Sequence, residues 1–216
     1  MIKNIFFDFN GTILEDTDLC YDIEAKMIEE EGLPPVSKEF YLDNFCFPVI
    51  DYYKKVGFDV SKDNYDRISK KFFDSYLKRE KNETSLNEGI VDLLKKLKKD
   101  GYSLYILTAS EEKILIGQLK ELGILEYFDG FSASKNIEAL GKIDYGRIFI
   151  KENNINTSES VMIGDTLHDY DVAKALNLKP VLYSKGHNSK TLLAKTDAPI
   201  VDNFEDFYKL LKISNF

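Results

Sequence analysis

The chain begins with one buried strand and then continues for a long stretch in which no second strand is predicted. Residues 2–7 are predicted to form a strand, whose apolar run Ile5-Phe6-Phe7 ends abruptly at Asp8, as is typical of a buried strand. From residue 16 to residue 83 the apolar residues recur at helical spacing, over 17–31 and again over 38–81. A compact sheet with alternating helices does not contain so long a gap. We therefore expect residues 16–83 to form an inserted helical domain.

After residue 84 strands and helices alternate again. This alternation predicts an α/β fold, a Rossmann-like, doubly wound and mostly parallel sheet built from residues 1–15 and 84–216. The predicted strands are 103–107, 128–133, 161–163, 180–183 and 198–200, and the predicted helices start at residue 90 or cover 111–122, 145–153, 172–176 and 207–211.

Composition excludes several classes of partner. The 216 residues are 44% hydrophobic, which suffices for a globular core. The net charge of −8 disfavours binding to the phosphate backbone of a nucleic acid. No apolar run approaches the roughly 20 residues that span a bilayer. The two cysteines, Cys20 and Cys46, are expected to be free thiols. We expect a cytoplasmic protein with no nucleic-acid or membrane partner, either a monomer or a weak homodimer.

Polar residues follow three of the predicted strands. The carboxyl ends of parallel strands meet at one edge of a sheet, where ligands bind in open α/β folds. The residues are Asp8, Asn10 and Thr12 after the first strand, Thr108 and Ser110 after the second, and Asp165 and Asp169 after the third. Lys142 lies in the sequence between the second and the third of these groups.

Each of these residues also has a purely structural interpretation. Thr108 and Ser110 would cap the helix that follows, and Asp169 would favour the N-terminus of its helix. Lys142 would be one of many solvated lysines, and His168 a surface or supporting residue. Such interpretations do not explain why every one of these strand ends carries groups suited to an anion and a cation.

At this point the chain resembles the haloacid dehalogenase superfamily, in the branch with a helical cap inserted soon after the first motif, as in phosphoglycolate phosphatases. The motif Asp-x-Asp-Gly-Thr is matched by residues 8–12 with one departure, and Gly-Asp-x-x-x-Asp is matched by residues 164–169. The Ser or Thr of the second motif matches Thr108, and the Lys of the third fits Lys142. The first and last motifs together are specific, and the other two are weak alone.

The resemblance implies a role for each motif residue. Asp8 would attack a substrate phosphorus and form an aspartyl phosphate, with Mg²⁺ neutralising the repulsion between carboxylate and phosphate. Asp169 would bind the metal through water or fix Lys142. The implied metal ligands are Asp8, the carbonyl of Asn10, Asp165 and Asp169, and the implied phosphate-binding residues are Gly11, Thr12, Thr108, Ala109 and Lys142.

Asn10 is the departure from the family motif. The family's second Asp protonates the leaving oxygen and then activates water, and an amide cannot carry that proton. The general acid–base contribution lost in this way is typically about 10²–10⁴-fold. Two origins fit the sequence: a natural substitution, tolerated for a good leaving group or with help from a residue such as His168, or a laboratory Asp→Asn change.

Three functions follow from these residues. The first is a Mg²⁺-dependent phosphatase acting on a small phosphorylated metabolite, slowed by Asn10. The second is a non-catalytic protein that binds a phosphorylated ligand. The third is a metal-free dehalogenase, which Asp165 and Asp169 disfavour because uncompensated acids near Asp8 would repel one another.

Overall fold

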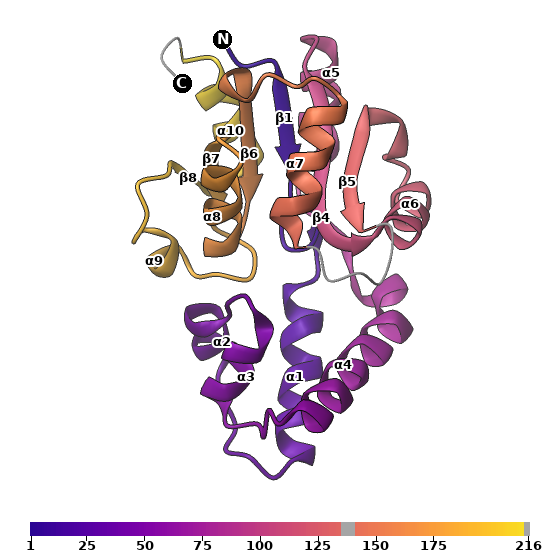
Figure 1. Ribbon diagram of the computed structural model, residues 1–216, viewed down its shortest axis with the longest axis vertical. Helices are drawn as coiled ribbons and strands as arrows, with labels where there is room; N and C mark the ends of the chain where they lie inside the picture. Colours follow the sequence, from indigo (N-terminus) through magenta and orange to yellow (C-terminus); the bar gives the residue numbers. More distant parts are fainter. Residues whose placement is uncertain (135–140, 214–216) are drawn as a thin grey trace.

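The computed structural model describes residues 1–134 and 141–213 and contains a parallel six-stranded sheet with a separate group of four helices below it (Figure 1). The strand order is β5-β4-β1-β6-β7-β8, and every neighbouring pair is parallel. This confirms the predicted fold class. The strands are β1 (Asn4–Phe7), β4 (Ser103–Glu111), β5 (Gly130–Ser134), β6 (Ser160–Gly164), β7 (Lys179–Tyr183) and β8 (Ile200–Val201).

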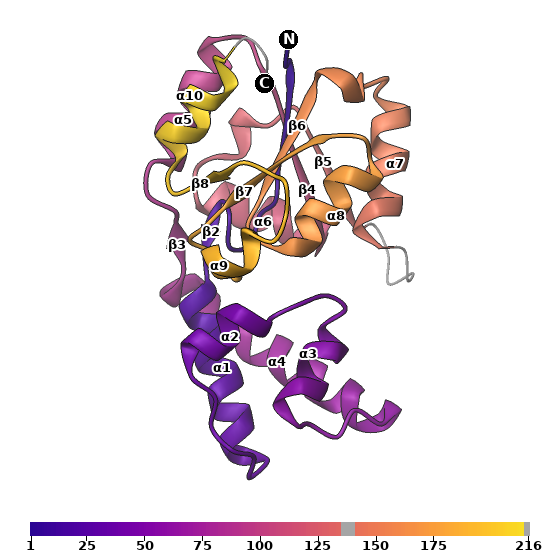
Figure 2. The ribbon, with the colours of Figure 1, turned by 90° about the vertical axis from the view of Figure 1, so that its left-hand side faces the viewer.

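Strand β1 lies at the centre of the sheet because it is apolar on both faces. Ile5 and Phe7 point into one hydrophobic core, and Phe6 points into the other. Helices α5, α6 and α10 cover the first face and α7 and α8 the second (Figure 2). These helices are α5 (Ile90–Lys99), α6 (Glu112–Glu121), α7 (Lys142–Glu152), α8 (Leu167–Ala175) and α10 (Phe204–Leu211), with short α9 (Lys190–Leu193), η1 (Leu125–Tyr127) and η2 (Thr157–Glu159).

The helical group is formed by residues 17–83, which lie in the sequence between the first two strands of the six-stranded sheet, β1 and β4. Its core is rich in aromatic residues, and Tyr41 and Tyr52 are fully buried in it beside Leu19 and Ile23. These helices are α1 (Thr17–Glu30), α2 (Lys38–Asn44), α3 (Val49–Val56) and α4 (Lys62–Glu83). The division of the chain at residues 16 and 83 stays a prediction.

A small antiparallel pair, which the sequence did not predict, joins the two parts. Strand β2 (Leu14–Glu15) pairs with β3 (Ser85–Leu86), so the chain leaves and re-enters the sheet region side by side. Each strand has only two residues, too short for a period of two to be visible. Helix α9 was missed for the same reason.

Several predicted boundaries were wrong by a few residues, and three of these errors concern candidate site residues, namely Thr108, Lys142 and Asp169. Strand β4 continues to Glu111, so Thr108 lies within the strand and not after it. Helix α7 starts at Lys142 instead of residue 145, and α8 starts at Leu167 instead of residue 172. In both helices the first turn carries a polar residue of the site described below, Lys142 in α7 and Asp169 in α8, so apolar spacing did not reveal it.

Within residues 1–134 and 141–213 no helix combines the length and the apolar character needed to cross a membrane. In the same part of the chain both cysteines are free, with Cys20 buried and Cys46 partly buried.

Candidate active site

Three carboxylates meet at the carboxyl edge of the sheet. Asp8 follows β1, Asp165 follows β6, and Asp169 lies in the first turn of α8. Their oxygen atoms lie within 4.8 Å of one another. The ammonium group of Lys142, at the start of α7, is hydrogen-bonded to Asp8 and lies 2.6 Å from Asp169 Oδ1. We call these four residues the floor cluster.

Burial and mutual repulsion make the floor cluster electrostatically unusual. Burial raises the pKa of Asp8 well above its ordinary value, and the charges of Asp169 and Asp165 raise it further against the opposing effect of Lys142. Burial likewise raises the pKa of Asp165 to about 6. Burial opposes ionisation of Asp169 too, but Lys142 holds the pKa of that carboxyl below its usual range.

The floor cluster fits a hard divalent cation. In the described part of the chain, Lys142 is the one cation with an ion pair to this cluster, and it pairs with Asp8 and Asp169 but not with Asp165, so negative charge is left over. Buried charge without a partner is costly, and carboxylate oxygens are the ligands that Mg²⁺ and similar ions take. The backbone at Gly11 closes on the same place, because a Cβ there would lie 2.3 Å from Asp165 Oδ2.

Asp165 is held rigidly by the loops on either side of it. Thr12 donates its hydroxyl hydrogen to Oδ1 at 2.8 Å, and the His187 backbone N–H donates to Oδ2 at 2.7 Å. Gly186 is required here, since a Cβ at that position would lie 2.2 Å from Asp165 Oδ2. Gly11 has a φ of 74°, which also favours glycine. The orientation of Asp165 is therefore set before any ligand binds.

Asp169 both caps its helix and orients Lys142. Thr166 and Asp169 form a capping box at the start of α8, in which Asp169 Oδ2 accepts the Thr166 N–H at 3.0 Å. This leaves Oδ1 for Lys142. The structural interpretation of Asp169 and the functional one therefore apply to different oxygens of the same side chain.

Thr108 and Ser110 do not cap the following helix, contrary to the structural interpretation. Helix α6 has Glu111 at its N-cap and no side-chain cap. The Thr108 hydroxyl instead accepts the Ser110 N–H at 3.2 Å, and Ser110 Oγ lies 3.5 Å from Asn10 Oδ1. Thr108 is buried at the end of the sheet beside β1. Ala109 lies between the two hydroxyl residues.

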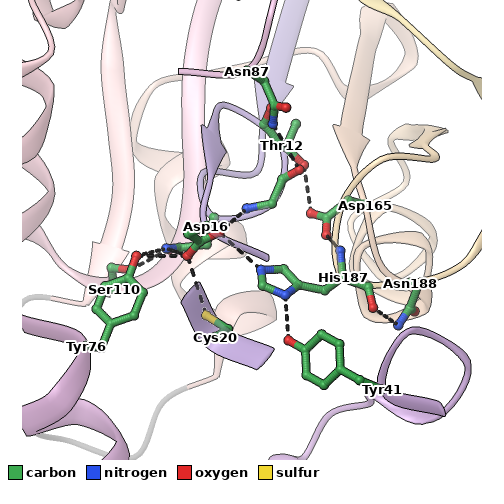
Figure 3. Close-up of polar contacts among 12 residues, drawn as sticks. Thr12, Asp16, Cys20, Tyr41, Tyr76, Asn87, Ser110, Asp165, His187 and Asn188 are labelled. Atoms are coloured by element: carbon green, nitrogen blue, oxygen red, sulfur yellow. Dashed lines mark hydrogen bonds and ion pairs between the residues drawn. The ribbon is translucent and has the colours of Figure 1, made fainter. Parts of the chain in front are cut away.

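A second cluster surrounds Asp16, the first residue beyond the β2 strand (Figure 3). Asp16 Oδ2 accepts hydrogen bonds from Asn10 Nδ2 at 2.7 Å and from the Tyr76 hydroxyl at 2.8 Å. Oδ1 accepts the Gly11 N–H at 2.9 Å and lies 3.2 Å from His187 Nε2. The Gly11 N–H, predicted to donate to a phosphate, thus has a partner within the protein.

This hinge cluster, defined as Asn10, Asp16, Tyr41, Tyr76 and His187, connects the four-helix group to the sheet region. Tyr41 belongs to α2 and Tyr76 to α4, whereas His187 lies in the loop after β7. His187 stands between Asp16 and Tyr41, with its Nδ1 2.7 Å from the Tyr41 hydroxyl (Figure 3). The contacts run from the loop after β1 to α2 and α4, two of the four helices of the group.

The charges in the hinge cluster are balanced. Burial acts to lower the pKa of His187, but the hydrogen bond and the charge of Asp16 raise it to about 9. Burial acts to raise the pKa of Asp16, yet His187, Asn10 and Tyr76 hold it below its usual range. The two residues form a buried ion pair. Among the described residues Asp16, Cys20 and His187 form a second group close enough to hold a metal, but no excess negative charge attracts one.

The loop between α2 and α3 contacts the sheet region beside the floor cluster. Phe47 packs on His168, with ring centroids 4.9 Å apart, and Asn188 Nδ2 donates to the Phe45 carbonyl at 2.9 Å. Burial lowers the pKa of His168. His168 was predicted to be a surface or supporting residue, and it supports this loop.

The sequence identified the floor residues as candidates, but of the hinge cluster it identified only Asn10. Asp16 belongs to no motif, and it makes no side-chain capping bond with α1. Tyr41 and Tyr76 lie in the stretch 38–81 that was predicted only to be helical, and His187 carried no signal. The one available clue was an acidic residue placed shortly after the Asn10-Gly11-Thr12 turn.

Comparison with known proteins agrees with this arrangement. A family model described as haloacid dehalogenase-like hydrolase matches residues 5–183, which include all the floor residues and the helices between them. The chain belongs to this family. That confirms the family predicted from the motifs.

Two curated relatives cover nearly the whole chain. The phosphoglycolate phosphatase of Neisseria meningitidis is 25% identical over 98% of this chain and 94% of its own length. That of Vibrio parahaemolyticus is 23% identical over 99% and 97%. Among solved structures, a haloacid dehalogenase-like hydrolase from Streptococcus pneumoniae has a TM-score of 0.81 at 24% identity, covering 98% of this chain and 99% of its own. A haloacid dehalogenase-like protein from Agrobacterium tumefaciens has a TM-score of 0.79 at 17% identity and covers 100% of both chains. At these identities the two structures are similar in fold alone.

Proposed function

We propose that this family member is a Mg²⁺-dependent phosphatase that hydrolyses small phosphate monoesters through an aspartyl-phosphate intermediate. The observation that carries the proposal is the floor cluster, in which three carboxylates gather at the end of the central strands and one lysine pairs with two of them. Such an arrangement suits a bound cation together with an anionic substrate. The names of the curated relatives point in the same direction.

In this proposal Asp8 is the nucleophile. Its oxygen attacks the substrate phosphorus, the bond to the leaving oxygen breaks, and water later releases phosphate from Asp8. Lys142 binds the phosphoryl oxygens on which charge rests in the transition state, and the Thr108 hydroxyl and the Ala109 N–H donate to the same oxygens. Thr12 takes part through its backbone and by fixing Asp165.

The metal would be held by Asp8, the backbone carbonyl of Asn10 and Asp165. Bound Mg²⁺ would neutralise the repulsion between the nucleophile and the phosphate. Asp169 supports the site by fixing Lys142, to which it is paired at 2.6 Å. The Asn10 side chain plays no part in metal binding here, since its amide is directed at Asp16 and Tyr76.

Purified protein should hydrolyse p-nitrophenyl phosphate, acetyl phosphate or 2-phosphoglycolate with added Mg²⁺, and EDTA should abolish the release of phosphate. Esters with good leaving groups should react fastest, because Asn10 cannot donate a proton. Asp8→Asn is the control, because it keeps the shape of the nucleophile and removes its charge. Absence of turnover on a broad panel of phosphate esters, in wild type and in Asn10→Asp alike, would refute the proposal.

Asn10 itself favours a second candidate, a protein that binds a phosphorylated ligand without turning it over. Binding of a phosphate analogue in the presence of Mg²⁺, with no turnover in wild type or in Asn10→Asp, would support it. Cytoplasmic location and a monomeric or weakly dimeric state stay predictions.

A further inference from the structure

The residue at position 10 is chemically matched to its neighbour. Asn10 Nδ2 donates to Asp16 Oδ2 at 2.7 Å and to the Tyr76 hydroxyl at 2.9 Å. An aspartate in this rotamer would put a second carboxylate oxygen in hydrogen-bond distance of the first, with no hydrogen between them. Two carboxylates at such a distance cannot both ionise without a large cost.

The groups around Asp16 stabilise a single negative charge. Asp16 is 1% exposed, and its oxygens already accept from Gly11, Tyr76 and Asn10 in addition to the His187 pair. His187 neutralises that single charge. In the Asp-x-Asp form of the motif the charge would stand at position 10, whereas here it stands six residues later, at the entrance to α1.

We propose that Asp16 is a positioning residue for the reaction, and that Asn10 and Asp16 form a matched pair in which the second carboxylate of the motif is relocated to position 16. Through Asn10 and Gly11 it orients the loop that follows Asp8. Through Tyr76 and His187 it fixes the four-helix group over the floor cluster. The kinetic consequences rest on the proposed phosphatase function, while the pairing itself does not.

The pairing predicts that exchanging the two side chains is tolerated better than changing position 10 alone. Asn10→Asp brings two carboxylates together. In the double variant Asn10→Asp with Asp16→Asn, the amide at 16 donates to the carboxylate at 10, so the hydrogen bond is kept with its direction reversed. Asp18→Asn is the matched control, since Asp18 is an exposed acid in the same turn of α1 that pairs with Lys38.

The first measurement is steady-state hydrolysis of p-nitrophenyl phosphate with Mg²⁺. Asn10→Asp should lower kcat by about tenfold or more, because a bond to a charged group is replaced by repulsion. The double variant should recover about tenfold over Asn10→Asp. KM should change by less than about twofold in each, since Lys142 and Thr108 are untouched. Asp18→Asn should match wild type.

The second measurement is the urea midpoint of unfolding, which needs no catalysis. Asn10→Asp should unfold at lower urea than wild type, and the double variant should return toward the wild-type midpoint. If wild type is inactive but the double variant regains the stability that Asn10→Asp loses, the phosphatase proposal is refuted and the pairing is supported. An active wild type in which Asn10→Asp is as fast and as stable as wild type overturns the pairing.

If Asn10→Asp does not fold, recovery of folded protein in the double variant supports the pairing. If neither Asn10→Asp nor the double variant folds, a second double-mutant cycle uses Asn10→Ala in place of Asn10→Asp. The fold decrease in kcat that Asp16→Asn causes should then be at least about fivefold smaller in the Asn10→Ala background than in wild type, because the partner of Asp16 is already absent. Equal effects in both backgrounds overturn the proposal.

Discussion

The floor cluster and the hinge cluster are both buried groups of charged residues, yet they differ in charge balance. The floor cluster places Asp8, Asp165 and Asp169 around Lys142, and the pKa of Asp8 is raised well above normal. The hinge cluster pairs Asp16 with His187 and satisfies both with hydroxyl and amide groups. Excess charge makes the first a place for ligands, and neutrality makes the second a structural joint.

The largest expected effect tests whether the floor cluster is the reactive one. Asp8→Asn should lower kcat by at least about 10⁴-fold, because the amide is not a nucleophile. Phosphate release from p-nitrophenyl phosphate measures it, and circular dichroism checks that the variant is folded. Residual activity near the wild-type level would place the chemistry elsewhere.

Lys142→Met should have the next largest effect. Loss of the ammonium group removes a partner of the transferring phosphoryl group and should lower kcat by about 10²–10³-fold. It also leaves Asp8 and Asp169 without their cation, so the free energy of unfolding should fall by about 3–5 kcal/mol when no metal is present. Urea unfolding with and without Mg²⁺ tests this, and added Mg²⁺ should restore part of the loss. An unchanged unfolding curve would contradict the charge imbalance.

The hinge cluster should respond to pH through His187. Its pKa is raised from 6.5 to about 9 by Asp16, with Asp165 and Asp8 also facing it. Because the pKa of His187 is higher in the folded than in the unfolded protein, its ion pair contributes fully to the free energy of unfolding below pH 6.5, and this contribution is lost as the pH rises through 9. Relative to His187→Gln, wild type should therefore lose about 3 kcal/mol of unfolding free energy across this range. Urea titrations at both ends of the range measure it, and parallel curves for the two proteins would refute it.

The smallest expected effect concerns the loop between α2 and α3. Phe47→Ala removes the ring that packs on His168, a contact worth about three- to tenfold in an equilibrium constant. We expect KM to rise within that range while kcat stays the same, because no residue of the floor cluster changes. Phe47→Tyr is the control that keeps the ring. A fall in kcat with unchanged KM would show that the loop acts on the chemistry instead.

Most of the sheet was predictable, because each strand carries its own local signal. Ile5, Phe6 and Phe7 are apolar on both faces, and β1 is indeed covered on both sides. The errors fell where a polar first turn faces the site, at Lys142 and Leu167, and at the two-residue strands β2 and β3. Apolar periodicity cannot mark elements whose side chains serve a site or that are shorter than one period.

The sequence by itself determined the fold class and placed Asp8, Asp165 and Asp169 near one another, because the polar ends of parallel strands must meet at one edge. Lys142 was identified only through its match to the third motif of the family. Only the tertiary structure decided the hinge cluster. Asn10 and Tyr76 are 66 residues apart, and Asp16 and His187 are 171 residues apart. Their meeting depends on how the four helices sit on the sheet region, which no local pattern encodes. For the same reason Asn10, a departure from the motif in the sequence, is in the structure the donor that Asp16 requires.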